Sequence, residues 1–249
     1  MPRPKKKAAI EIEAPPKFAG FAPDAMNFFR QLRNYNHRDW FLKKKDHYET
    51  TLLAPMRALV FEVADRLDDA GLPLAANRKF PVMRIYRDVR FSANKTPYKT
   101  AISAYLRRGG QGVHSGGVFL QFSDKERFVA MGFWLPEREL LNAWRARIAA
   151  KPAEFQKVLA ALHKHGHSLD GEGSLKRLPR GFDAHAKSPV AEYLKLNSFF
   201  VMQDVSQAQL RSAKLVDLIL KFAASTRPLL DYGWKVEAGV PPSQTEHFE

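Results

Sequence analysis

Segment 84–100 holds the densest group of side chains that could do chemistry. Its five basic residues, two tyrosines and one aspartate are Arg84, Tyr86, Arg87, Asp88, Arg90, Lys95, Tyr98 and Lys99. Guanidinium forks and ammonium groups bind phosphate and carboxylate groups, and tyrosine hydroxyls supply further donors. The segment therefore predicts a binding site for a small anionic ligand, which we expect to bear a phosphate.

Asp88 leaves two other interpretations of this segment open. In one, Asp88 acts as an acid/base while the arginines stabilise developing charge, so that the protein is an enzyme acting on a phosphorylated substrate. No second acid or nucleophile lies at a suitable spacing, so the sequence does not decide whether the protein is an enzyme. In the other, Asp88 pairs with its basic neighbours and the lysines form a solvated rim on a sheet edge.

A second compact basic group lies at residues 175–183 and includes Arg177. Two placements are open: Arg177 lines the same cavity as Arg84 and Arg90, or the segment only covers the sheet. In the first case Arg177 adds another guanidinium to the predicted anion site.

Three histidines, His163, His165 and His167, alternate near the end of a predicted helix. No carboxylate or cysteine accompanies them at the spacing of metal ligands. We therefore predict no metal site, and nothing in the sequence indicates a cofactor. The glycine-rich segment 107–117 lacks the Gly-Lys-Ser/Thr of a P-loop, so we interpret it as a linker.

The predicted site needs a rigid support, and the surrounding sequence predicts a β-hairpin. Apolar and polar residues alternate over residues 82–91, which is typical of a strand with one buried face. A second extended run covers residues 98–106, and the residues between the two runs include Ser, Asn, Thr and Pro, which favour loops. Such a hairpin would display Arg84, Arg90, Lys95 and Lys99 together.

The remaining pattern predicts an α+β fold with one antiparallel sheet. Residues 118–122 and 127–134 form a second predicted hairpin, so the sheet has at least four strands, and residues 198–203 predict a further one. Apolar residues at helical spacing predict helices at residues 23–33, 36–70, 136–150, 152–165 and 206–234. Asn36 and Ser206 are predicted N-caps. Helices from both ends of the chain then pack the sheet.

The 249-residue chain has 45% hydrophobic and 12% aromatic residues, enough for a sizeable core. We expect a disordered basic arm at residues 1–17, a single α+β domain at residues 18–235 and a flexible tail at residues 236–249. The arm lacks the apolar block of a signal peptide, and no apolar run is long enough to cross a bilayer. Because the chain also has no cysteine, we expect a cytoplasmic protein without a membrane partner.

The net charge is +14 at pH 7, and part of it is concentrated in the arm and in residues 84–108. Such a balance favours acidic partners, among them phosphorylated metabolites and nucleic acid. Association with nucleic acid through the arm and the hairpin is therefore a third interpretation of function. No recognised nucleic-acid-binding motif is present.

Four pieces of the chain resemble one protein family. They are residues 18–21, the hexapeptide Asn36-His37-Arg38-Asp39-Trp40-Phe41, the run from Arg87 to Thr100, and residues 175–183; the third is highly specific. Over about residues 18–225 the chain resembles DUF2461, a largely bacterial family of conserved hypothetical proteins. The resemblance implies a single domain, and it brings no catalytic residues with it.

Overall fold

The computed structural model of the protein describes residues 16–77, 79–90, 92–109 and 116–240. Its centre is a five-stranded antiparallel sheet in which each strand pairs with the next along the chain, in the order β1-β2-β3-β4-β5. The strands are β1 (Leu74–Ala75), β2 (Ile102–Arg108), β3 (Gly117–Phe122), β4 (Arg127–Phe133) and β5 (Phe199–Asp204). The predicted α+β class and the sheet of at least four strands are confirmed.

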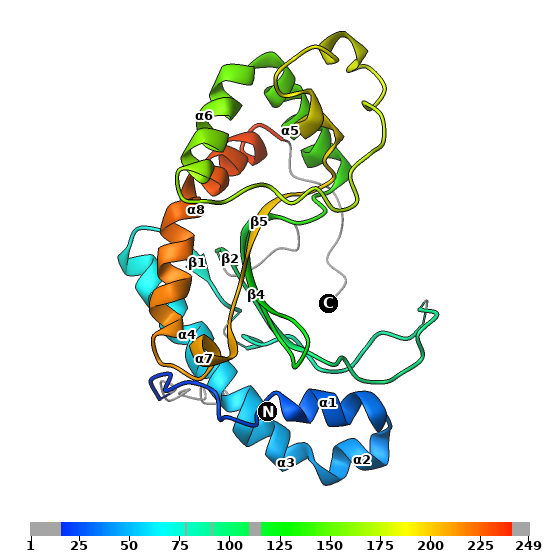
Figure 1. Cartoon of the computed structure of the whole chain (residues 1–249), viewed down its shortest axis with the longest axis vertical. Coiled ribbons are helices and arrows are strands. Elements are labelled where there is room, and N and C mark those ends of the chain that lie inside the picture. Colours follow the sequence, from blue (N-terminus) through cyan, green and yellow to red (C-terminus); the bar gives the residue numbers. More distant parts are fainter. Residues whose placement is uncertain (1–15, 78, 91, 110–115, 241–249) are drawn as a thin grey trace, which may run out of the picture.

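Helices from both ends of the chain pack this sheet (Figure 1). They are α1 (Asn27–Asn34), α2 (Arg38–Lys43), α3 (Lys45–Tyr48), α4 (Ala54–Asp69), α5 (Arg138–Ala150), α6 (Pro152–His163), α7 (Gln207–Leu210) and α8 (Leu215–Glu237). A π-helical turn at Glu49–Leu53 joins α3 to α4, and two 3-10 turns, η2 (Asp183–His185) and η3 (Ala191–Lys195), lie between α6 and β5. We call the end that holds α1–α3 the lower lobe and the end that holds α5 and α6 the upper lobe, after their places in Figure 1.

Alternate residues of each strand point toward the helices, and these residues are apolar, so one face of the sheet is apolar. On β3 and β4 these residues are Val118, Leu120, Phe122, Val129, Met131 and Phe133, and all are buried. α8 contributes buried side chains along its length, among them Ile219, Phe222 and Leu230. Each such burial stabilises the fold by about 1.5–3 kcal/mol. The opposite face of the sheet lines a wide groove.

Two glycines allow elements to approach closely. Gly132 in β4 has a φ of +141°, and a Cβ at this position would lie 2.2 Å from the carbonyl oxygen of Phe199 on β5. A Cβ on Gly233 of α8 would lie 2.1 Å from the ring of Phe133 and 2.5 Å from that of Trp144. Neither position accepts a larger residue unless the backbone or the core rings move.

A buried arginine closes the upper lobe. Arg145 on α5 is 6% exposed, and its guanidinium donates to the carbonyl oxygens of Leu194 at 3.0 Å and Leu196 at 2.9 Å. Beside it, Trp144 stacks on Phe199 at the start of β5, with ring centroids 4.1 Å apart. The long connection from α6 to β5 is thereby fixed where it enters the sheet.

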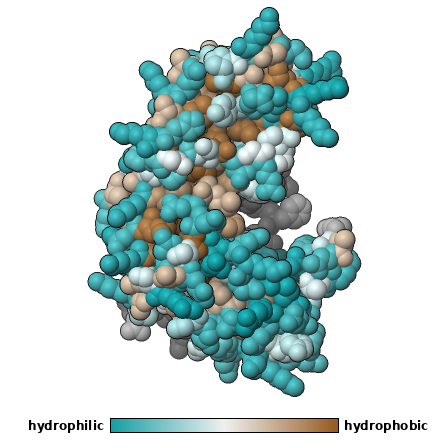
Figure 2. All heavy atoms as spheres, in the orientation of Figure 1, coloured by the Kyte–Doolittle hydropathy of each residue, from teal (hydrophilic) through white to brown (hydrophobic). Residues whose placement is uncertain are grey.

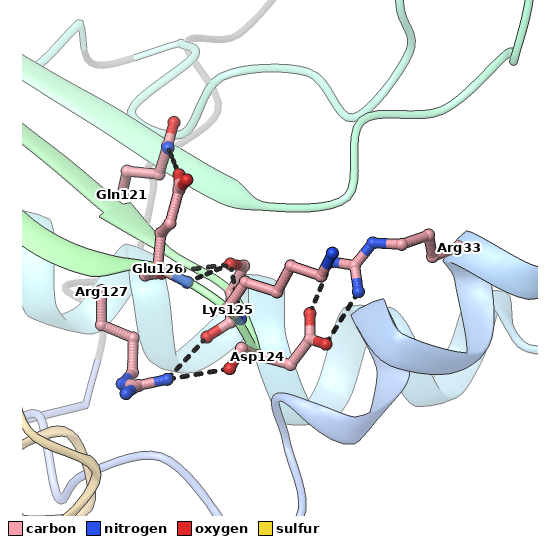
Figure 3. A network of polar contacts seen from close by, with 7 residues as sticks. Arg33, Gln121, Asp124, Lys125, Glu126 and Arg127 are labelled. Carbon is pink, nitrogen blue, oxygen red and sulfur yellow. Dashed lines mark hydrogen bonds and ion pairs between the residues drawn. The ribbon is translucent and has the colours of Figure 1, made fainter.

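A network of polar contacts holds the β3–β4 turn against the lower lobe (Figure 3). Arg33 at the end of α1 donates two parallel hydrogen bonds to the carboxylate of Asp124, at 2.9 and 2.8 Å. Arg127 donates to the carbonyl oxygens of Asp124 at 3.0 Å and Val205 at 3.2 Å. The hydrogen bond from Arg33 is the main reason that the pKa of Asp124 lies below its ordinary value.

The two arms of the predicted first hairpin do not form a regular ladder. Among the described residues they meet at two isolated antiparallel bridges, Val82 with Ala104 and Tyr86 with Tyr98. The prediction of a strand at residues 82–91 is therefore wrong, and the run at residues 98–106 becomes regular only in β2. We call residues 82–100 the irregular hairpin; its residue 91 lies outside the described part of the chain.

Proline and an interrupted pattern explain this difference. Pro97 has no N–H, so it only accepts a hydrogen bond, at 2.8 Å from the backbone of Arg87. Arg87 itself stands where the alternation requires an apolar residue, so the arm cannot bury a continuous face. The arms still run side by side, because the Lys99 N–H donates to the carbonyl of Ile85 at 2.8 Å.

The predicted caps also differ in the structure. The N-cap of α2 is His37, whose Nδ1 accepts from the Trp40 N–H at 3.4 Å, so the prediction of Asn36 as the cap is wrong. Ser206 does cap a helix through its hydroxyl, but that helix is the short α7. The long helix α8 begins separately at Leu215.

The chain ends extend the domain slightly. Val236 is buried and α8 continues to Glu237, two residues past the predicted end of the domain at residue 235. Most of the predicted arm and tail, residues 1–15 and 241–249, lies outside the described residues. Within the described ranges, no helix combines the length and the apolar character needed to cross a membrane.

Replacing Arg33 by Gln should lower stability in a pH-dependent way. The folded-state pKa of Asp124 lies below the reference value of 3.8, so the stabilisation by this pair is complete above that pH and is lost as the pH falls through the folded-state pKa. We expect Arg33→Gln to reduce the free energy of unfolding by about 1 kcal/mol at neutral pH, and by less in acid. Urea unfolding over about pH 3 to 7 measures the difference.

Arg30→Gln is the matched control, because it removes an exposed charge from the same helix. Its effect should not follow the titration of Asp124. A difference between wild type and Arg33→Gln that stays constant down to the acid end of the range would contradict the pairing.

Candidate functional site

The irregular hairpin is fastened to the lower lobe at Tyr98. This residue is 3% exposed, and its ring stacks on that of Phe41 in α2 with centroids 4.3 Å apart. The side chain of Asn36 makes two reciprocal bonds to the Tyr98 backbone: Nδ2 donates to the carbonyl and Oδ1 accepts from the N–H, both at 3.0 Å. The Asn36 side chain therefore makes the two hydrogen bonds that a neighbouring strand would make. Tyr98 attaches the hairpin to the lower lobe and is less suited to be a ligand donor. Tyr86, at 5.4 Å from the Tyr98 ring, stays 52% exposed.

Three of the predicted cations, Arg84, Arg87 and Lys99, lie on the base of the hairpin and influence one another electrostatically, and the charge of Arg84 also acts on Asp88. The pKa of Lys99 lies below its ordinary value, first because the ammonium is partly buried and then because of the charges of Arg84 and Arg87. The Nε of Arg87 is buried without a hydrogen-bond partner. In the described part of the chain no carboxylate forms an ion pair with any of the three. We call Arg84, Arg87 and Lys99 the base cation cluster.

The other two predicted cations already donate to acceptors of the protein at the tip of the hairpin. Arg90 donates to both carboxylate oxygens of Asp88, at 3.1 and 2.8 Å, and the Lys95 ammonium donates to the carbonyl of Val89 at 2.9 Å. The structural interpretation, in which Asp88 pairs with a basic neighbour, thus describes the tip. The hydrogen bonds from Arg90 lower the pKa of Asp88 to about 2. A carboxylate with so low a pKa is a weak base and is not a proton donor at neutral pH.

Arg177 lies far from these residues. The segment at 175–183 belongs to the upper lobe, where the Leu175 N–H donates to the carbonyl of Lys195 in η3 at 2.9 Å. The irregular hairpin extends to the side just above the lower lobe, whereas the segment at 175–183 lies near the top of the view (Figure 1). The structure therefore does not bring Arg177 to the cavity predicted around Arg84 and Arg90.

A wide concave surface lies on the open face of the sheet, and the sequence interpretation missed it. The groove has a volume of about 1040 Å³. Its floor is formed by Tyr105, Phe119 and Phe128 on three neighbouring strands, and Met202 on β5 is 45% exposed beside them. Figure 2 shows the surface hollowed between the two lobes on the side of this face.

The sequence contained a signal for this groove in the alternate residues of β3 that do not face the helices. Residues 118–122 of β3 are apolar at four of five positions, and the pattern was compatible with a strand buried on both faces. In the structure Phe119 and Gln121 face the groove while their neighbours face the helices. A strand apolar on both parities, with no second layer of helices left in the sequence to cover it, would have indicated an open aromatic face.

The three histidines do not gather. In the residues that the structure describes, no group of three or more His, Cys, Asp or Glu side chains could hold a metal ion. His167 has a structural contact: its Nε2 lies 2.8 Å from the hydroxyl oxygen of Ser225 on α8, and burial lowers its pKa. Most of the glycine-rich segment interpreted as a linker, residues 110–115, lies outside the described residues.

Asn36→Ala should loosen the base of the hairpin. The substitution leaves the N–H and the carbonyl of Tyr98 without partners at a partly buried position, which costs about 1–3 kcal/mol. We expect a matching loss in the free energy of unfolding and faster hydrogen exchange at the Tyr98 amide. Asn34→Ala, at the exposed end of α1, is the control. Unchanged exchange at Tyr98 in Asn36→Ala would show that the ring stack alone holds the hairpin.

A separate experiment addresses the tip. The Asp88 carboxyl should titrate near pH 2 in the wild type, and in Arg90→Gln its pKa should return toward 3.8, because the hydrogen bonds from Arg90 are the largest cause of the shift. NMR titration of the side-chain carboxyl carbon of Asp88 reports both values. Lys95→Gln is the control, since Lys95 contacts a carbonyl and not the carboxylate. An Asp88 pKa that is equal in wild type and Arg90→Gln would rule out the ion pair.

Comparison with known proteins identifies a family. The family model described as a conserved hypothetical protein (DUF2461) matches residues 24–232. No curated protein and no solved structure matches the chain. Two of the pieces that carry the resemblance, residues 36–41 and 87–100, meet at Tyr98, and the match extends through both lobes. The chain belongs to the DUF2461 family of conserved hypothetical proteins.

Proposed function

We propose that the protein binds a small anion bearing a phosphate group at the base cation cluster. The observation that carries this proposal is the partly buried ammonium of Lys99 beside the guanidinium groups of Arg84 and Arg87, with no carboxylate paired to them in the described residues. Gathering like charges where water is partly excluded is unfavourable for the free protein. An anion between them relieves the repulsion.

Phosphate suits this cluster in geometry as well as in charge. Arginine presents a planar fork that matches two phosphate oxygens, and lysine adds a compact point charge. The unpartnered Nε of Arg87 is one donor that a ligand would satisfy. The exposed Tyr86 lies on the same hairpin, with its ring near that of Tyr98, and its hydroxyl is a further donor that we assign to the ligand.

The proposed ligand is a metabolite-sized anion, and the setting that we propose is the bacterial cytoplasm. The chain has no cysteine, in keeping with a reducing compartment where disulfides are rare. Catalysis by Asp88 does not form part of the proposal, because this carboxylate is held by Arg90 and has a pKa of about 2.

Binding of sulfate, pyrophosphate and inorganic phosphate, followed by amide NMR shifts at low ionic strength, tests the proposal. We expect Arg87→Gln and Lys99→Met each to weaken binding by about tenfold, which corresponds to about 1.4 kcal/mol. Lys99→Met should leave the thermal stability unchanged or raise it, since it removes a partly buried charge from beside two others. Lys95→Met is the matched control, because it removes the same charge from the tip.

Sulfate gives a pH test, since it does not titrate in the range of lysine. A bound anion favours the protonated Lys99, so affinity for sulfate should fall as the pH rises through the lowered pKa of Lys99, before an ordinary lysine titrates. Equal losses in Lys95→Met and Lys99→Met would contradict the proposed site. Binding of single-stranded RNA with a steep salt dependence, without saturable binding of phosphate, would instead favour the nucleic-acid interpretation.

A further inference from the structure

The groove on the open face of the sheet is ordered in rows across the strands. Residues directly opposite one another on antiparallel strands point to the same face. One row runs from Tyr105 through Phe119 and Ala130 to Met202. A second row, next to it, runs from Arg107 through two glycines to Phe200. An aromatic row therefore lies beside a row that begins with a cation.

Arg107 is a partly buried cation in aromatic surroundings. Its guanidinium carbon lies 4.6 Å from the centre of the Tyr105 ring. Burial lowers its pKa, and no carboxylate contributes to that shift. Nor does any carboxylate in the described ranges form an ion pair with it. A guanidinium in this setting lacks the counter-charge that partly buried cations ordinarily have.

The two positions next to Arg107 in its row carry no side chain. Gly117 on β3 lies opposite Arg107, and Gly132 on β4 lies opposite Gly117. Both line the groove, with the 57% exposed Trp134 at its margin. Backbone, and not a side chain, therefore lines the groove at the two positions next to Arg107, and apolar rings adjoin them.

We propose that this groove is a second ligand site, distinct from the base cation cluster, and that it binds a small carboxylate with a planar aromatic body. The carboxylate lies over the backbone of Gly117 and Gly132 and accepts two hydrogen bonds from Arg107. The aromatic body lies over Phe119 and Phe128, which present their faces and edges to a planar ring. Met83 and Met202 on either side adapt to the outline of the ligand.

The charges along the groove give the ligand one orientation. Three of the four acidic residues that line it, Asp170, Glu172 and Asp204, lie on or beside β5, whereas Arg107 lies on β2. The fourth, Glu126, lies in the β3–β4 turn between two basic residues, Lys125 and Arg127. Strands are spaced by about 4.8 Å, so about 14 Å separates the two sides of the sheet. A carboxylate is attracted to the β2 side and repelled from the β5 side. The aromatic body extends from the first toward the second.

Titration with 2-naphthoate, followed by amide NMR shifts of Gly117 and Gly132, tests the proposal. The neutral isostere 2-naphthamide separates the role of charge from that of the ring. We expect saturable binding of 2-naphthoate, much weaker binding of the amide, and about a tenfold or greater loss in Arg107→Gln. Ala130→Leu should also block binding, because it fills the centre of the aromatic row without changing the charge.

Two controls keep the result specific. Arg108→Gln removes the neighbouring charge, which packs over Trp234 at 5.1 Å, and it should leave affinity for 2-naphthoate within about twofold of wild type. Arg87→Gln should do the same, so failure of this proposal is distinguishable from failure of the phosphate site.

Three outcomes would overturn the proposal. The first is equal affinity for 2-naphthoate and 2-naphthamide, and the second is unchanged affinity in both Arg107→Gln and Ala130→Leu. The third is a dimer in sedimentation that both variants dissociate, without binding of the probe, because the open face would then be covered by a second copy of the chain.

Discussion

The stack of Tyr98 on Phe41 is the contact on which the candidate phosphate site depends. The irregular hairpin has no regular ladder to hold it, so its position must come from elsewhere. The buried ring supplies this position, and Asn36 supplies the two hydrogen bonds that a neighbouring strand would have made. Because Lys99 follows Tyr98 directly, fixing one backbone position fixes the other. The rigidity of the lower lobe is thereby transmitted to the cations.

The lower lobe is in turn fixed to the sheet, and the sheet forms the groove that we propose as a second site. The bidentate pair of Arg33 with Asp124 joins α1 to the β3–β4 turn, and Phe21 packs on Phe122 at 5.8 Å. The period of two that turns Phe122 toward the helices turns Phe119 and Gln121 away from them. Helices cover one face, so the aromatic rings of the other face line a groove.

The sequence predicted those parts in which local pattern and tertiary environment agree. β3 and β4 form near residues 118–122 and 127–134, as predicted, because their alternation and turn residues favour the same arrangement. The same reasoning gave a wrong prediction for the irregular hairpin. Pro97 cannot donate a backbone hydrogen bond, and Arg87 interrupts the row of apolar residues. Composition identified a basic segment but could not separate Arg90, which faces Asp88, from Lys99, which does not. That distinction depends on side-chain direction in a segment without a regular period. The sequence did not identify Arg107 as a candidate site residue for a related reason, since its neighbours in space are glycines from other strands.

Lys99 and Arg107 are informative because two other partly buried cations of the described residues have hydrogen-bond acceptors in place. Arg147 pairs with Glu154 at 2.8 Å, and Arg145 is surrounded by carbonyl oxygens. In the described residues the side chains of Lys99 and Arg107 have no such acceptor, and a partly buried cation without an acceptor lowers the stability of the fold. Departures from an otherwise consistent pattern are expected where function requires them. Both departures also adjoin the same arm of the irregular hairpin: Met83 lines the groove, its N–H donates to Ser103 of β2 at 2.8 Å, and Arg84 is the next residue. A displacement of this arm would therefore alter both sites together.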